Sequence, residues 1–96
     1  MSKGLEHQLT KAKTTIGRAG GGADIEIDDK QISVLHCVVT GTKSKDTVRL
    51  YDLASENGTY VEGERIQAAS LGHFSEFRIG STVFLLTIVS KHSEAT

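Results

Sequence analysis

Apolar residues occur along this chain in short runs, each about the length of one β-strand, separated by Gly, Asn, Asp and Ser. Such punctuation predicts strands joined by tight turns, and no stretch shows the period of an amphipathic helix. We therefore predict an all-β domain with strands at Leu5–Leu9, Thr14–Gly17, Asp24–Ile27, His36–Gly41, Thr47–Leu53, Tyr60–Val61, Phe74–Ile79 and Val83–Val89. Many short strands at this spacing favour a β-sandwich.

The last predicted strand is apolar on both faces, with Val83, Phe84, Leu85, Leu86, Ile88 and Val89. This pattern is typical of a strand that is covered on both sides. We therefore expect it to form the centre of the core.

The length of 96 residues suits one domain with its own hydrophobic core. A single cysteine, Cys37, excludes an internal disulfide framework and fits a reducing compartment, so we expect a cytoplasmic domain with Cys37 in its core. The 11 basic and 12 acidic residues form no basic stripe, so nucleic acid is not an expected partner. No apolar run is long enough to span a bilayer, and we expect no direct membrane contact.

Three polar residues stand where they can bind an anionic peptide. Arg18 follows a predicted strand at the mouth of a glycine loop, and its guanidinium can meet a phosphate with two parallel donors. Ser33 adds a hydroxyl, and Asn57, within SENGTY, offers a donor and an acceptor to an extended backbone. Taken singly, each also has an ordinary interpretation: a solvated arginine, a loop serine and a left-handed turn residue.

Four stretches in this order resemble the forkhead-associated (FHA) domain, a phosphothreonine-recognition module: TIGR, DIEIDDKQISVLH, LYDLASENGTYVEGERI and FRIGSTVFLL. The resemblance runs from about Leu5 to Ile88. It implies an eleven-stranded β-sandwich whose loops at one end bind the ligand. The family's first strand is missing or curtailed before Leu5, so we expect a single FHA domain, residues 1–96, cut from a larger protein.

By this resemblance, Arg18 and Ser33 correspond to the residues that hold the phosphate, and Asn57 to the asparagine that holds the peptide backbone. The family's histidine, here His36, braces the loops without touching the ligand. The expected structural support of the site comprises Gly17, His36, Gly58 and Thr59.

The sequence departs from the family pattern at residues that flank the site. Val34 stands where many members have a polar side chain that assists with phosphate. Glu56 stands where Thr, Ser or Arg is frequent, and its carboxylate should repel a phosphate. Glu62–Gly63 replaces the common Asn-Gly.

Two hypotheses follow from these residues. In the first, the domain binds a phosphothreonine-containing partner, or a phosphorylated segment of its own parent protein, and the parent can be membrane-anchored. In the second, favoured by Val34 and Glu56, it is a degenerate FHA scaffold that makes phosphate-independent contacts in a larger assembly, such as a type III secretion inner-membrane ring.

An enzyme, a cofactor and a metal ion are all unsupported by the sequence. The glycine loop matches no nucleotide-binding motif. Consecutive strand residues point to opposite faces, so His36 and Cys37 do not form a nucleophile–base pair. Residues with metal-binding side chains show no ligand spacing, and the acids of one predicted strand are expected to form a solvated face. These residues are His7, His36, His73 and His92, and Asp24, Glu26 and Asp28.

Overall fold

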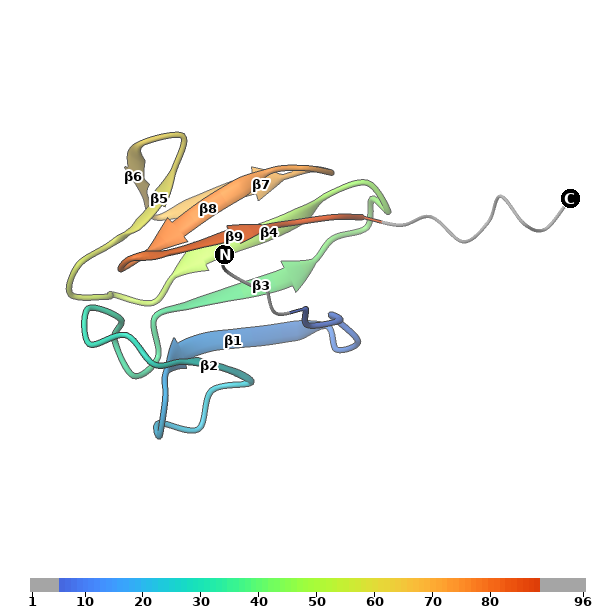
Figure 1. The fold of residues 1–96 in the computed structure, drawn as a ribbon. Helices are drawn as coiled ribbons and strands as arrows, with labels where there is room; N and C mark the ends of the chain where they lie inside the picture. The colour runs from blue at the N-terminus through green and yellow to red at the C-terminus, as the bar shows by residue number, and fades with distance from the viewer. Residues whose placement is uncertain (1–5, 89–96) are drawn as a thin grey trace, which may run out of the picture.

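The computed structural model describes residues 6–88 and contains, within them, nine strands in two facing sheets and no helix (Figure 1). The strands are β1 (Lys13–Arg18), β2 (Ile25–Ile27), β3 (Cys37–Gly41), β4 (Val48–Asp52), β5 (Thr59–Val61), β6 (Glu64–Ile66), β7 (Ala68–Leu71), β8 (Glu76–Ile79) and β9 (Thr82–Leu85). One sheet has the order β2-β1-β3-β4-β7 and the other β6-β5-β8-β9. Strands β1 and β2 are parallel, and the other neighbours are antiparallel. The prediction of an all-β sandwich is confirmed.

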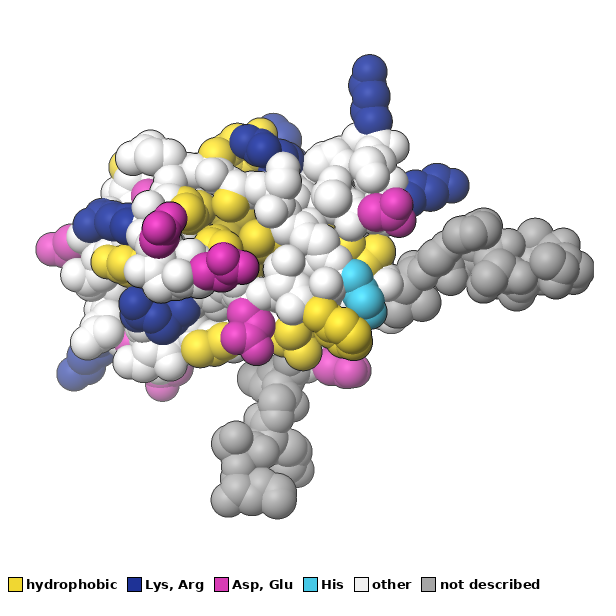
Figure 2. Space-filling model, turned by 90° about the horizontal axis from the view of Figure 1, so that it is seen from above, with side chains coloured by type: hydrophobic (Ala, Val, Ile, Leu, Met, Phe, Trp, Pro, Cys, Tyr) yellow, Lys and Arg dark blue, Asp and Glu magenta, His cyan; other side chains and the backbone are white. Residues whose placement is uncertain are grey.

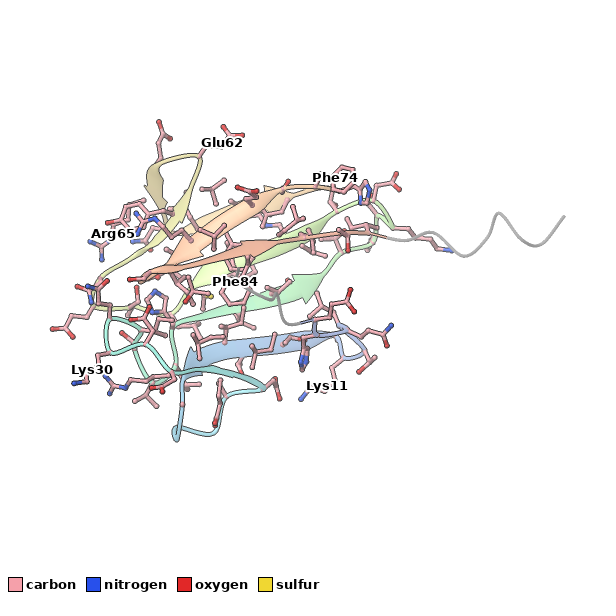
Figure 3. The ribbon with its side chains drawn as sticks, in the orientation of Figure 1. Lys11, Lys30, Glu62, Arg65, Phe74 and Phe84 are labelled. Carbon is pink, nitrogen blue, oxygen red and sulfur yellow. The ribbon has the colours of Figure 1, made fainter. Side chains whose placement is uncertain are left out.

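The core lies between the two sheets because alternate residues of each strand point inward. Its buried side chains are Ile16, Ile32, Cys37, Val39, Leu50, Leu71, Phe77 and Ile79. The rings of Phe77 and Phe84 stack with their centroids 4.9 Å apart, and Figure 3 shows Phe84 between the sheets. Cys37 is a core residue as predicted, and its burial raises the pKa of the thiol to about 12.

The expectation that the last strand forms the centre of the core is wrong. The strand ends at Leu85, and β9 is an edge of its sheet, so within the described chain no strand pairs with its second edge. Val83 and Leu85 are each 57% exposed, and only Phe84 and Leu86 pack against the core. Figure 2 shows that hydrophobic side chains, in yellow, lie at the surface among charged ones. The apolar run reflects one buried face and one uncovered face.

Two other strand predictions also need correction, and two strands were missed. Residues 6–9 form no strand because they contribute one apolar side chain, Leu9, which is 39% exposed; Leu5 and Val89 lie outside the described residues. The strand predicted from Phe74 begins at Glu76, since Phe74 has a φ of 69° and is 66% exposed. Strands β6 and β7 were not predicted, because they are short and mostly polar or small.

The acids around β2 are exposed, in agreement with the predicted solvated face, and two of them also hold the edge of the first sheet together. Asp24 accepts hydrogen bonds from Lys11 Nζ at 2.5 Å and from Thr15 N at 2.9 Å, and these lower the pKa of its carboxyl to about 2. Glu26 accepts from the backbone N–H groups of Gly20 and Gly22, which lower its pKa. The glycine loop that follows Arg18 is therefore fastened to β2.

Candidate functional site

The connection between β2 and β3 and the connection between β4 and β5 lie side by side at one end of the sandwich, on the left in Figure 1. Besides the backbone bond from Leu53 N to His36 O at 2.9 Å, three hydrogen bonds that involve side chains join these two loops. Glu56 N donates to Ser33 Oγ at 3.0 Å, Asn57 Nδ2 donates to Gln31 O at 2.9 Å, and the His36 ring bonds Gly58 O at 2.8 Å. The loops thus form one continuous surface, and Arg18 borders it at the end of β1.

Arg18 is held at its backbone and is largely free at its guanidinium. Its backbone N–H donates to Ser33 O at 3.0 Å, which ties β1 to the β2–β3 loop. The side chain is partly exposed, and Nη1 reaches only Lys30 O at 3.4 Å, a weak hydrogen bond. Within residues 6–88 the single ion pair is Lys11–Asp24, so no carboxylate neutralises Arg18.

Gly17 permits the close approach of the β2–β3 loop to β1. A Cβ at this position would lie 1.8 Å from the carbonyl oxygen of Val34, a backbone atom that cannot turn away. The Val34 side chain lies over Gly21 and is 44% exposed. Gly17 therefore determines where Ser33 and Val34 sit relative to Arg18.

His36 is fully buried beneath the two loops. Its Nδ1 lies 3.0 Å from Ser33 N and must accept that backbone N–H, so the neutral ring carries its proton on Nε2 and donates it to Gly58 O. The imidazole connects the loop that contains Ser33 to the turn that contains Asn57. It makes these bonds from inside the molecule, out of reach of a ligand on the surface.

The SENGTY turn is built around the carboxylate of Asp52, which the sequence did not single out. Its oxygens accept from Ser55 N at 3.0 Å, Ser55 Oγ at 2.6 Å and Thr59 Oγ1 at 2.7 Å. Burial alone would raise the pKa of Asp52, but these hydrogen bonds outweigh it and keep the pKa below its ordinary value. Ser55 Oγ in turn accepts from Gly58 N at 2.9 Å, so the whole turn is internally bonded.

The left-handed residues of the β4–β5 connection are Ala54 and Gly58, with φ of 54° and 96°. Asn57 is not among the positive-φ residues of the described chain. Its ordinary interpretation as a left-handed turn residue is therefore wrong. The exposed Asn57 carboxamide instead uses its N–H to reach the facing loop, and its oxygen remains available.

Asp29 is a second supporting residue that the sequence did not single out. Its carboxylate accepts from Ser81 N at 2.8 Å and from Gln31 N at 2.9 Å, and both bonds lower its pKa. It thereby fixes the loop before Ser33 to the β8–β9 turn of the other sheet. An acid two residues before the N–H that it accepts is a common turn signature, and this signal could have identified it.

Two depressions of the surface lie elsewhere, over the β5–β8 sheet and beside β7. One, of about 220 Å³, is lined by Tyr60, Glu62, Gly63, Glu76, Phe77, Arg78 and Val83. The other, of about 380 Å³, is lined by Val61, Glu62, Ser70, Leu71, Phe74, Ser75 and Glu76. Neither contains Arg18, Ser33 or Asn57. The candidate site is thus an exposed loop surface, a shape that suits an extended segment of chain better than an enclosed small molecule.

The fold and this loop surface define a class of protein. The FHA-domain family model matches residues 14–80, so the chain belongs to the FHA family. No curated protein matches the chain.

Several solved structures are similar to it. The FHA domain of the CT664 protein from Chlamydia trachomatis is 30% identical, with a TM-score of 0.82, covering 91% of this chain and 88% of that one. EmbR from Mycobacterium tuberculosis, solved with a low-affinity phosphopeptide, is 33% identical, with a TM-score of 0.77, covering 86% of this chain and 21% of that one. A domain solved in a study of phosphothreonine-dependent FHA interactions is 25% identical, with a TM-score of 0.79, covering 88% of this chain and 85% of that one.

Proposed function

We propose that this FHA domain binds a phosphothreonine-containing segment of a partner, or of its own parent protein, and recruits it without catalysing a reaction. The observation that carries the proposal is the convergence of Arg18, Ser33 and Asn57 on two loops that are bonded to each other. The similar structure solved with a phosphopeptide, and the one from a study of phosphothreonine-dependent FHA interactions, support the same class of ligand.

Each of the three side chains has a free group of the required kind. Arg18 supplies a permanent positive charge for a phosphate of charge about −1.5 to −2. Ser33 Oγ accepts from Glu56 N and keeps its own hydrogen to donate to a phosphate oxygen. Asn57 donates to Gln31 O and keeps its oxygen to accept from the backbone N–H of a bound peptide. Because internal hydrogen bonds already order the loops, little conformational freedom is left to lose on binding.

A second candidate function, a scaffold that binds its partner without phosphate, is favoured by two flanking residues. The exposed Val34 side chain has no donor for phosphate, and the exposed carboxylate of Glu56 repels one. Both features should weaken phosphate binding, although Arg18 and Ser33 are still present to bind it.

Calorimetry with a phosphothreonine peptide library and unphosphorylated twins tests the proposal. We expect a dissociation constant of roughly 1 to 100 μM for the best phosphopeptide and no measurable binding of its twin. Arg18→Ala should abolish binding and shift the melting temperature by only a few degrees, because the side chain makes one weak bond. The matched control is Arg49→Ala. The Arg49 side chain bonds Ser70 on β7, so its removal should leave the affinity unchanged.

Equal affinity for phosphorylated and unphosphorylated peptides would contradict the proposal and favour the scaffold. In that case the double variant Val34→Arg, Glu56→Thr distinguishes two explanations for the missing phosphate dependence. Phosphate-dependent binding by the double variant would show that these two residues alone had suppressed the site. Absence of binding would show that the surface itself does not recognise phosphate.

A further inference from the structure

Besides Arg18, the cations Lys30 and Arg65 lie at the loop end of the sandwich (Figure 3). Lys30 stands in the β2–β3 loop and Arg65 in β6, and both are exposed. Neither side chain has a carboxylate within ion-pair distance among residues 6–88. A cation without an acidic partner beside a peptide-binding surface is available to a ligand.

Arg65 lies directly over the turn that contains Asn57. A Cβ on Gly58 would be 2.7 Å from Arg65 Nε, and Nη2 reaches Ser55 O at 3.4 Å, a weak bond that leaves most guanidinium donors free. Lys30 lies on the other side of the surface, with its carbonyl beside the Arg18 guanidinium. An extended segment that crosses the loops at Asn57 thus has cations on both sides.

No neighbouring carboxylate is paired with either cation. Glu26 and Asp29 each accept two backbone N–H groups, and the exposed Asp28 and Glu64 form no ion pair with Lys30 or Arg65 within the described residues. Glu56 is exposed on the same turn and forms no ion pair within the described residues. It opposes a phosphate at this turn, so a ligand gains most by placing its charges near Lys30 and Arg65.

We propose that the domain selects phosphothreonine segments that also carry an acidic side chain close to the phosphothreonine; this inference rests on the proposed function. The phosphate lies between Arg18 and Lys30, so Lys30 supplies the second phosphate cation that Val34 cannot. Arg65 binds the carboxylate, for which its planar fork of donors is matched. Arg65 is then the residue that determines specificity, and Lys30 contributes to phosphate affinity whatever the flanking sequence.

Phosphothreonine peptides with one aspartate moved through the three positions on each side, in an otherwise uncharged sequence, test this inference against matched asparagine peptides. At low salt, aspartate at one position should tighten binding by about 2- to 5-fold, as expected of an exposed charge pair. Arg65→Gln should remove that gain. Lys30→Gln should weaken every phosphopeptide by a similar factor and keep the gain. The control Lys45→Gln, in the exposed β3–β4 connection at the opposite end, should change neither (Figure 1).

The inference is overturned if no aspartate position tightens binding, or if the gain persists in Arg65→Gln. Either result leaves the proposed function standing as long as the phosphorylated peptides still bind more tightly than their twins. Loss of that phosphate dependence in the wild-type protein would overturn both. Thermal unfolding of each variant ensures that the comparison is made between folded proteins.

Discussion

Replacing His36 by alanine removes the buried side chain that joins the two binding loops. The change deletes the acceptor of Ser33 N–H and the donor to Gly58 O, at 3.0 and 2.8 Å. It also leaves a cavity where a side chain with 0% exposure had been. We expect His36→Ala to lower both stability and phosphopeptide affinity, because one interaction supports the fold and the shape of the site together.

The size of the effect follows from these contacts. A buried polar group left without its partner costs about 1 to 3 kcal/mol, and the Gly58 carbonyl meets this description. With the cavity and the second broken bond, we expect a total loss of about 2 to 4 kcal/mol. In a domain of this size, 1 kcal/mol lowers the melting temperature by roughly 4 to 8 °C, so the transition should fall by about 10 °C or more.

Thermal unfolding followed by circular dichroism, and calorimetric titration well below the transition, measure the two effects. The matched control is His7→Ala, an exposed histidine outside any strand, which should change neither. A melting temperature within about 2 °C of the wild type, together with lost binding, would refute the reasoning and place His36 in contact with the ligand. A large loss of stability with unchanged affinity would show that the bridge does not shape the site.

Gly17→Ala should destabilise the domain by at least about 2 kcal/mol, because its Cβ would meet the Val34 carbonyl, whereas Gly41→Ala, with open space around it, should be nearly neutral; denaturant unfolding compares them. Asp52→Asn should cost about 1 to 3 kcal/mol and weaken phosphopeptide binding, since the amide cannot accept all three of the hydrogen bonds that hold the SENGTY turn. The pKa of Asp24 is lowered to about 2 from 3.8, so its contribution is complete above about pH 4 and is lost as the pH falls through 2. The difference in melting temperature between wild type and Asp24→Asn should therefore shrink between pH 4 and pH 2; an unchanged difference would contradict the assignment.

The order of motifs in the sequence was enough to predict the FHA fold and to select Arg18, Ser33, His36 and Asn57. These residues lie in short segments whose turn chemistry is local, so their spacing along the chain carries the information. Burial of Cys37 also followed from local alternation in its strand. That the selected residues bind phosphate remains a prediction.

Only the tertiary structure decided which strand is an edge and which polar groups meet. The run at Val83–Val89 looks like a central strand, yet β9 has no neighbour on one side within the described chain, and sequence periodicity does not record the order of strands in a sheet. The partners of Asp29 and Asp52 likewise depend on turns that bring donors to them, one from the other sheet. The approach of Arg65 to Gly58 arises from the pairing of β5 with β6, a contact that the weak strand signal of β6 did not predict.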